Sequence, residues 1–139
     1  MERWFILILN IKQKGDNMQE NFQNLAENYP EQFNTWYDKK TFPIRDYWYL
    51  ARNCPEHFTT WFDKKTFPED DYIYLAIYCS EHFDTWFDKE NYEKDNYIYL
   101  AIHCSNHFTT WFDKEKYPKE DYWFLIKHCL EYQHIWTKI

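Results

Sequence analysis

The chain has 139 residues, of which 24% are aromatic, and a formal net charge of −7. So many large apolar rings exclude an intrinsically disordered chain, and a single glycine, Gly15, excludes the glycine-rich loops that hold phosphates or dinucleotides. The acidic balance disfavours direct binding to nucleic acid, and no apolar run approaches the length of a membrane span.

Residues 1–20 do not follow the pattern of the remaining chain, and we expect them to form an N-terminal extension or cap. Their apolar run at residues 4–9 is short and lacks a small-residue cleavage site, so it does not predict a signal peptide. Residues 14–18 can be encoded by a ribosome-binding sequence followed by a start codon. One hypothesis is therefore that translation starts at Met18 and that residues 1–17 precede the native protein. The intact mass of protein expressed from its own gene tests this.

From residue 21 onward, three kinds of residue recur every 25 positions. They are Trp36, Trp61, Trp86, Trp111 and Trp136; Leu25, Leu50, Leu75, Leu100 and Leu125; and Cys54, Cys79, Cys104 and Cys129, with Tyr29 in the slot before the cysteines. Residues 57–64 return unchanged at 107–114. A fixed period in this range is typical of a solenoid. We expect residues 21–139 to form one array of about four full repeats plus a partial C-terminal copy.

The first half of a repeat predicts one helix, as the copy beginning at Phe67 illustrates. Pro68 fits the first helical position, and the acidic residues 69–71 fit the positive first turn. Four apolar residues then follow at i, i+3, i+4 and i+7, the spacing of one buried helix face: Tyr72, Leu75, Ala76 and Cys79.

The second half of the repeat predicts a second, shorter helix. Ser80 fits its N-cap, a slot that Pro30 and Pro55 occupy in the earlier copies. Phe83, Trp86 and Phe87 lie at i, i+3 and i+4, which places them on one face of that helix. A single repeat buries too little apolar surface to offset the entropy of ordering it, so we expect the copies to fold together as an array.

Two segments carry a resemblance to a known family. Leu25-Ala26-Glu27-Asn28-Tyr29-Pro30 and Leu50-Ala51-Arg52-Asn53-Cys54-Pro55 are each followed by an apolar pair, Phe33/Trp36 and Phe58/Trp61. Over about residues 21–139 the chain resembles the leucine-rich repeat variant family. The resemblance implies an all-α, right-handed solenoid of tandem 25-residue two-helix repeats, in which α-helices alternate with short 3₁₀-type helices. Aromatic residues replace the family's aliphatic ones, and its cysteine-rich iron–sulfur segment has no counterpart here, so only the architecture is carried over.

Two recurring pairs resemble reactive sites but favour a structural interpretation. Cys-x-x-His occurs at Cys54/His57 and in the next two copies, yet helices of successive repeats pack too far apart to share a metal or form a disulfide. The step Asp63-Lys64 recurs in four equivalent copies, whereas catalysis needs one asymmetric cluster. We therefore expect core cysteines, surface ion pairs, no metal, no cofactor and no enzymatic activity, in a reduced, cytoplasmic protein.

The slots that vary between copies indicate where a partner binds. On the first helix they form a face away from the Tyr-Leu-Ala-Cys side. The predicted contact residues on this face are Trp48, Arg52, Ile73, Ile77, Tyr78, Ile98, Ile102, His103, Trp123 and Lys127. An apolar stripe with differing polar neighbours is typical of a binding face on a solenoid. The alternative is that the Trp/Ile slot packs on the second helices.

The negative charge is concentrated in the middle of the chain. Residues 69–95 hold nine acidic side chains against Lys89 and Lys94, whereas the segments on either side are balanced. The acidic residues added to the predicted contact set are Glu69, Asp70, Asp71, Glu93 and Asp95. Such a patch attracts a basic partner, although dipole-matched helix starts and solvation also account for part of it.

These patterns predict a non-enzymatic protein–protein interaction module. Its specific form would be a bacterial or phage inhibitor or immunity-type protein whose acidic centre occupies a basic cleft of its target. The alternative is a nucleic-acid-binding repeat protein that uses its aromatic rings to stack on bases. Salt dependence and direct binding to single strands separate the two.

Overall fold

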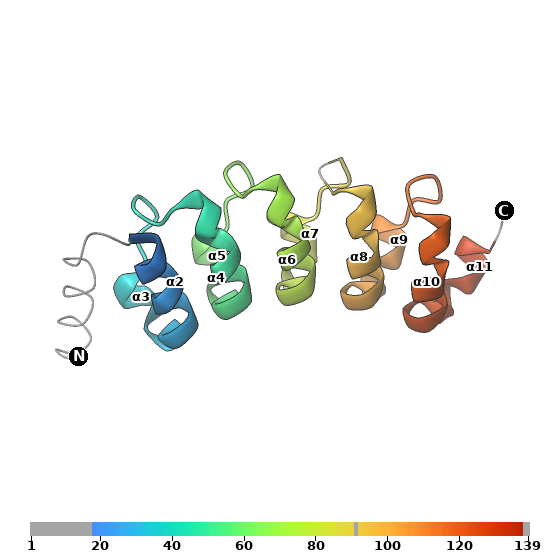
Figure 1. Ribbon diagram of the computed structural model, residues 1–139. Coiled ribbons are helices and arrows are strands. Elements are labelled where there is room, and N and C mark those ends of the chain that lie inside the picture. The colour runs from blue at the N-terminus through green and yellow to red at the C-terminus, as the bar shows by residue number, and fades with distance from the viewer. Residues whose placement is uncertain (1–17, 91, 138–139) are drawn as a thin grey trace. The chain divides into compact units, whose positions relative to one another are not determined.

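The computed structural model describes residues 18–90 and 92–137, with side chains from Phe22 onward. Contacts between backbone positions divide the chain into two compact units, residues 1–68 and 69–139. The described residues form α- and 3₁₀-helices and no strands, and neighbouring helices pack in sequence. The predicted fold class, an all-α tandem helical repeat of the solenoid type, is confirmed (Figure 1). The hypothesis about residues 1–17 falls outside the described residues.

In unit 1–68 the first helices α2 and α4 pack against each other, and α5 packs against α4. Its elements are α2 (Met18–Asn28), η1 (Pro30–Gln32), α3 (Phe33–Trp36), η2 (Ile44–Asp46), α4 (Tyr47–Asn53), η3 (Pro55–His57) and α5 (Phe58–Trp61), where η marks a 3₁₀-helix.

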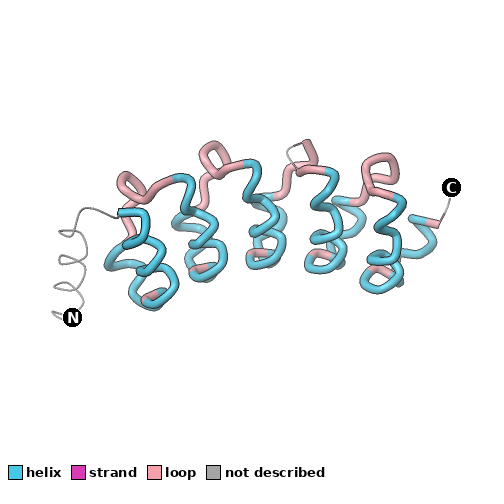
Figure 2. Tube along the Cα trace, viewed as in Figure 1, coloured by secondary structure: helices cyan, strands magenta, loops and turns pink. Residues whose placement is uncertain are grey.

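In unit 69–139 the first helices α6, α8 and α10 form a row in which α8 contacts both neighbours. Its elements are η4 (Glu69–Asp71), α6 (Tyr72–Tyr78), η5 (Ser80–His82), α7 (Phe83–Trp86), η6 (Lys94–Asn96), α8 (Tyr97–His103), η7 (Ser105–His107), α9 (Phe108–Trp111), η8 (Lys119–Asp121), α10 (Tyr122–His128), η9 (Leu130–Tyr132) and α11 (Gln133–Trp136). Figure 2 shows the loops returning to one end of the helices after each second helix.

The break between the two helices of a repeat explains the recurring tryptophan. At Cys54 the backbone leaves the helix, with φ −130° and ψ 46°, while its N–H still donates to Leu50 O. The indole Nε1 of Trp61 then donates to Cys54 O at 2.8 Å. The same bond recurs from Trp36, Trp86, Trp111 and Trp136 to the residue seven positions earlier. Only tryptophan combines such a large apolar ring with a donor at this place, so the slot does not vary.

The predicted core residues are buried. The Leu, Ala and Cys slots of the inner repeats are at most 1% exposed, as are the four inner tryptophans. The tyrosine slot is buried at Tyr47, Tyr72 and Tyr97 and half-exposed at Tyr122. The interpretation of the four cysteines as core residues is confirmed, since all four are buried free thiols.

The structure corrects three local predictions. Ser80 is the first residue of a 3₁₀-helix whose N-cap is Cys79, and Pro30 and Pro55 also lie inside their helices rather than at the N-cap. Phe87 is extended, with ψ 130°, because the second helix ends at Trp86. A 3₁₀ turn precedes the Phe-x-x-Trp turn, and this shifts both boundaries.

The third correction concerns the start of the first helix. Pro68 lies before the first helical residue, Glu69, and in the equivalent slots Pro43 and Pro118 are extended N-caps with ψ near 130°. The proline therefore ends the loop instead of opening the helix. An extended conformation before the 3₁₀ turn suits its fixed φ.

Successive repeats are joined by stacked rings and, at the loops, by ion pairs. The imidazole of His57 lies 4.4 Å from the Phe33 ring, and that of His107 lies 4.3 Å from Phe83, both nearly parallel. Lys39 pairs with Asp63 at 3.3 Å and Lys89 with Asp113 at 3.4 Å. The Asp-Lys step thus provides surface ion pairs as expected, but they run between repeats.

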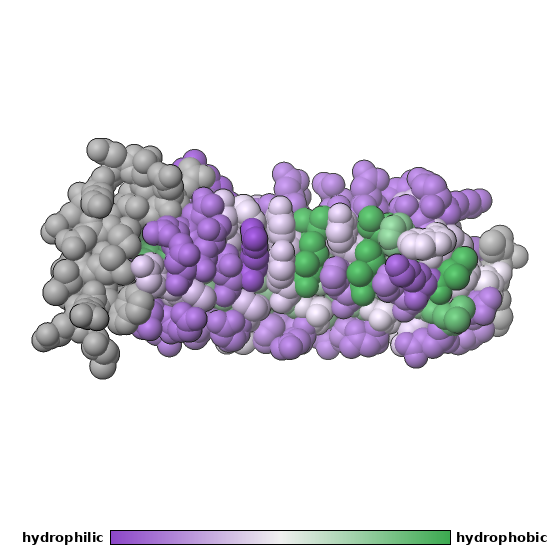
Figure 3. All heavy atoms as spheres, turned by 60° about the horizontal axis from the view of Figure 1, so that its bottom comes forward, coloured by the Kyte–Doolittle hydropathy of each residue, from purple (hydrophilic) through white to green (hydrophobic). Residues whose placement is uncertain are grey.

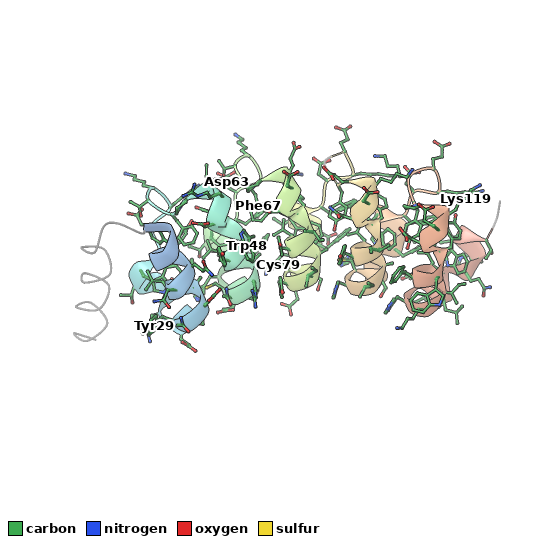
Figure 4. The ribbon with its side chains drawn as sticks, viewed as in Figure 1. Tyr29, Trp48, Asp63, Phe67, Cys79 and Lys119 are labelled. Carbon is green, nitrogen blue, oxygen red and sulfur yellow. The ribbon has the colours of Figure 1, made fainter. Side chains whose placement is uncertain are left out.

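The aspartates of these steps also build the loop. Asp63 accepts the backbone N–H of Lys65 through its side chain and that of Phe67 through its carbonyl. The bond from Lys65, together with Lys39, lowers the pKa of Asp63. In Figure 4, Asp63 and Phe67 lie at the loop end of their unit, and Tyr29 lies at the opposite end.

Candidate protein-binding surface

The first helices of unit 69–139 carry an apolar band on their exposed side. Ile73 and Ile77 on α6 are half-exposed, as are Ile98 and Ile102 on α8, and Trp123 on α10 is 57% exposed. Because α8 packs against both α6 and α10, these side chains form a continuous strip across three helices. In Figure 3 apolar surface, in green, gathers on this face toward the C-terminal half of the chain.

The variable slots beside the band are more polar. Tyr78 is 40% exposed, and His103 and Lys127 are also exposed. Lys127 Nζ lies 5.0 Å above the centre of the Trp123 ring, so the band ends on α10 in a cation–π contact. Burial of His103 and the nearby His128 lower the pKa of the His103 imidazole.

The equivalent face of unit 1–68 has a different chemistry. Trp48 is half-exposed and its ring lies 3.8 Å from that of Tyr49, but Arg52 replaces the second isoleucine and is exposed. On α2 the same slots are Gln23 and Glu27, whose side chains share a hydrogen bond of 3.1 Å. The apolar band therefore belongs to residues 69–139.

Exposed carboxylates border the band where the first helices begin. Glu69, Asp70, Glu93 and Asp95 are exposed, and Asp71 is half-exposed. Two carboxylates outside the predicted contact set complete this border, Glu120 and Asp121. Glu120 occupies the slot 25 residues after Asp95 and is exposed, so the repeat itself identifies it.

The carboxylates at these helix starts repel one another. Partial burial, followed by Glu120 and Asp95, raises the pKa of Asp121. Partial burial and Asp70 raise the pKa of Asp71. Like charges close together favour the protonated form, so this border is an unfavourable concentration of negative charge that a cation relieves.

A cavity of about 640 Å³ lies near this border, between the starts of η6 and α10. Tyr117, Pro118 and Tyr122 supply its apolar lining. Three lysines and two glutamates surround it, including Lys94, Lys119 and Glu120. Because these charges oppose one another, the cavity does not favour one class of charged ligand.

The cysteines are not arranged for chemistry. Burial raises the pKa of Cys54, Cys79 and Cys104 to about 12 and that of Cys129 to about 11, so all four stay protonated at neutral pH.

Within residues 18–90 and 92–137, no group of three or more His, Cys, Asp or Glu side chains is placed to hold a metal ion. None of the helices in the same residues is long and apolar enough to cross a membrane.

Comparison with protein-family models, with curated proteins and with solved structures finds no match to this chain. The candidate surface therefore rests on the repeat, the burial of its side chains and the distribution of its charge.

Proposed function

We propose that the chain is a non-enzymatic protein-binding module and that residues 69–139 contact a basic surface of a protein partner. The charge distribution carries this proposal. Residues 69–139 hold fourteen acidic and seven basic side chains, whereas residues 1–68 hold nine of each. The whole net charge of −7 thus belongs to one of the two compact units.

The exposure of these carboxylates supports the same function. Seven of the nine acidic side chains between residues 69 and 95 are exposed, and the other two are half-exposed. Lys89, one of the two basic residues in that segment, pairs with Asp113 in the next repeat. A concentrated negative surface speeds association with a positive one and disfavours partners of like charge.

An inhibitor or immunity-type role is the specific form of this proposal. Such a protein needs a rigid acidic surface that enters a basic cleft, and stacked repeats with buried aromatic cores supply rigidity.

The alternative function, binding of single-stranded nucleic acid through aromatic stacking on its bases, has less support. Trp36, Trp61, Trp86 and Trp111 are at most 1% exposed and have no free ring face for a base, and the exposed rings of Tyr78 and Trp123 lie in the acidic unit.

A capture experiment with matched charge reversals tests the function. The full chain is immobilised and exposed to lysate of its source cells, treated with nuclease. We expect one basic protein to be captured and to dissociate as salt rises from about 50 to about 300 mM. The variant E69K/D70K/E93K should lose it, whereas E27K/E31K/E56K, with three equally exposed reversals in unit 1–68, should retain it.

Two results contradict the proposal. Equal capture by both variants would mean that the acidic unit does not contact the partner. Tight binding of a labelled single-stranded oligonucleotide to the wild type at about 150 mM salt would favour the nucleic-acid function instead.

A further inference from the structure

We propose that the face of α6, α8 and α10 binds an amphipathic helical segment of the partner, with its apolar side on the isoleucine band and Lys or Arg along its border. This inference rests on the proposed function and names the kind of segment that the same unit recognises.

The band has the composition of an interface core. Ile73, Ile77, Ile98 and Ile102 each keep part of their side chain exposed although they belong to well-packed helices. Contiguous apolar surface with a polar border is typical of protein-binding sites. Each isoleucine pair is spaced i, i+4, so the pairs form two parallel rows across the stacked helices.

A row of carboxylates follows one edge of the band. Asp70, Asp95 and Glu120 each lie three residues before the first band residue of their helix, at Ile73, Ile98 and Trp123. Each carboxylate lies in the 3₁₀ turn that leads into its helix, where residues three apart lie on the same side. All three are exposed, and no ion pair joins them to a cation within the part of the chain that the structure describes.

Charge complementarity therefore selects a basic segment. Burial raises the pKa of Asp121, and repulsion from Glu120 and Asp95 adds to this effect; a lysine or arginine placed over Asp95 and Glu120 reduces that repulsion. The same slots of η2 and α4 carry Arg45 and Arg52, both exposed, in place of an acid and an isoleucine. A basic segment is thus attracted to the face of unit 69–139 and repelled by the equivalent face of unit 1–68.

The spacing of the rows favours a helix. Packed helices lie about 8–10 Å apart, so successive isoleucines along a row are separated by about that distance. Residues i and i+7 of an α-helix are about 10.5 Å apart on one face, whereas same-side residues of a strand are about 6.7 Å apart. Three helices span roughly 20 Å, which matches a segment of about 13 residues.

A synthetic helical peptide tests this inference without knowledge of the natural partner. The probe is a fluorescent peptide of about 18 residues, with Leu at helical spacing on one face and Lys along one border of that face. We expect it to bind the full-length chain, measured by anisotropy. Replacing its Lys by Glu, or its Leu by Gln, should weaken binding by at least about tenfold.

Variants of the chain locate the site. I73S/I98S and D70N/D95N/E120Q should each weaken binding by about tenfold, and the second should also remove most of the salt dependence. R45S/R52S, which changes the equivalent face of unit 1–68, should stay within about twofold of the wild type. Far-UV circular dichroism and melting temperature establish that each variant is folded, which is expected because the replaced side chains are exposed or half-exposed.

The outcomes separate this inference from the proposed function. If I73S/I98S binds the peptide and the captured partner as the wild type does, while D70N/D95N/E120Q binds neither, the surface recognises charge alone and the helical-segment inference is wrong. If both variants behave as the wild type, the site is wrong, and capture by E69K/D70K/E93K decides the function. If the wild type fails to bind the peptide, this inference is overturned, and the capture experiment decides the function by itself.

Discussion

At the scale of single residues, tyrosine hydroxyls in one slot differ in their hydrogen bonding. Tyr47 OH and Tyr37 OH are 2.8 Å apart and share a hydrogen bond. Phe87 replaces the partner tyrosine for Tyr97, whose hydroxyl is buried with no hydrogen-bond partner. A buried polar group without a partner loses its hydration and gains nothing in return.

This difference predicts opposite effects of one substitution. Tyr97→Phe should leave the free energy of unfolding unchanged or raise it by about 1 kcal/mol, because it removes a buried hydroxyl that has no partner. Tyr47→Phe should lower it by about 1 kcal/mol, because it breaks a hydrogen bond and leaves the half-buried Tyr37 OH without that partner. Urea unfolding measures both. Equal losses in the two variants would mean that the Tyr97 hydroxyl has a hydrogen-bond partner in solution.

At the scale of elements, one small residue on the first helix determines how closely repeats pack. Ala51, Ala76 and Ala101 are fully buried. Within unit 69–139 the thiol of the following repeat lies over the alanine carbonyl, at 3.9 Å for Cys104 over Ala76 and 3.7 Å for Cys129 over Ala101. The same slot on α10 is Ile126, which is 53% exposed. The residue in this slot is therefore small where another repeat covers it.

Substitutions in this slot should depend on the repeat. Ala101→Ile should lower the free energy of unfolding by about 1–3 kcal/mol, because extra methylene groups force α10 away from α8. Ile126→Ala should change it by less than about 0.5 kcal/mol, since the side chain is half in solvent. Thermal unfolding compares them. A loss of several kcal/mol in Ile126→Ala would show that this edge of α10 is covered in solution.

The element scale also shows where sequence reasoning fails. The buried faces were predictable, because the apolar residues at i, i+3, i+4 and i+7 identify the side of the helix that packs. The placement of Ser80 at an N-cap and of Phe87 in the helix was wrong, since a 3₁₀ turn opens the second helix and that helix ends at Trp86. A 3₁₀ turn has no distinct residue preference of its own in this sequence, so its position follows from the packing of Phe83 and Trp86.

At the scale of the whole molecule, the carboxylates of unit 69–139 fall into two classes. Burial, Glu120 and Asp95 raise the pKa of Asp121. Partial burial also acts to raise the pKa of Asp113, but the Glu115 N–H and Lys89 outweigh it and the pKa is lowered. The first carboxylate therefore destabilises the folded state when ionised, and the second stabilises it.

The two classes predict opposite pH behaviour. Asp121→Asn should raise the melting temperature at pH 7. A raised pKa in the folded state means that the ionised carboxylate lowers the stability of the fold. This loss of stability disappears as pH falls below about 4, where the carboxyl is protonated. Asp113→Asn should lower it at pH 7, because a lowered pKa means stability that is lost as pH falls through the folded value. Each shift should be about 1–3 °C at pH 7. The shift of Asp121→Asn should vanish near pH 3, whereas that of Asp113→Asn should only become smaller there, because the folded pKa of Asp113 is lowered. Calorimetry from pH 7 to pH 3 measures both, and a shift of the same sign in both variants would contradict the assignment.

The sequence by itself determined the 25-residue period, the two helices per repeat, the buried slots and the segment that holds the charge, because each depends on spacing along one chain. Only the tertiary structure decided which residues meet within a repeat and between successive repeats. The bond from Trp61 to Cys54 O, the pairing of Lys39 with Asp63 and the repulsion between Asp95 and Asp121 depend on where the chain turns back. The sequence also did not decide whether the isoleucine slot is exposed, since its periodicity fits both a helix face that another helix covers and one that faces solvent. Stacking settles that question, because a side chain is buried only where a neighbouring repeat covers it.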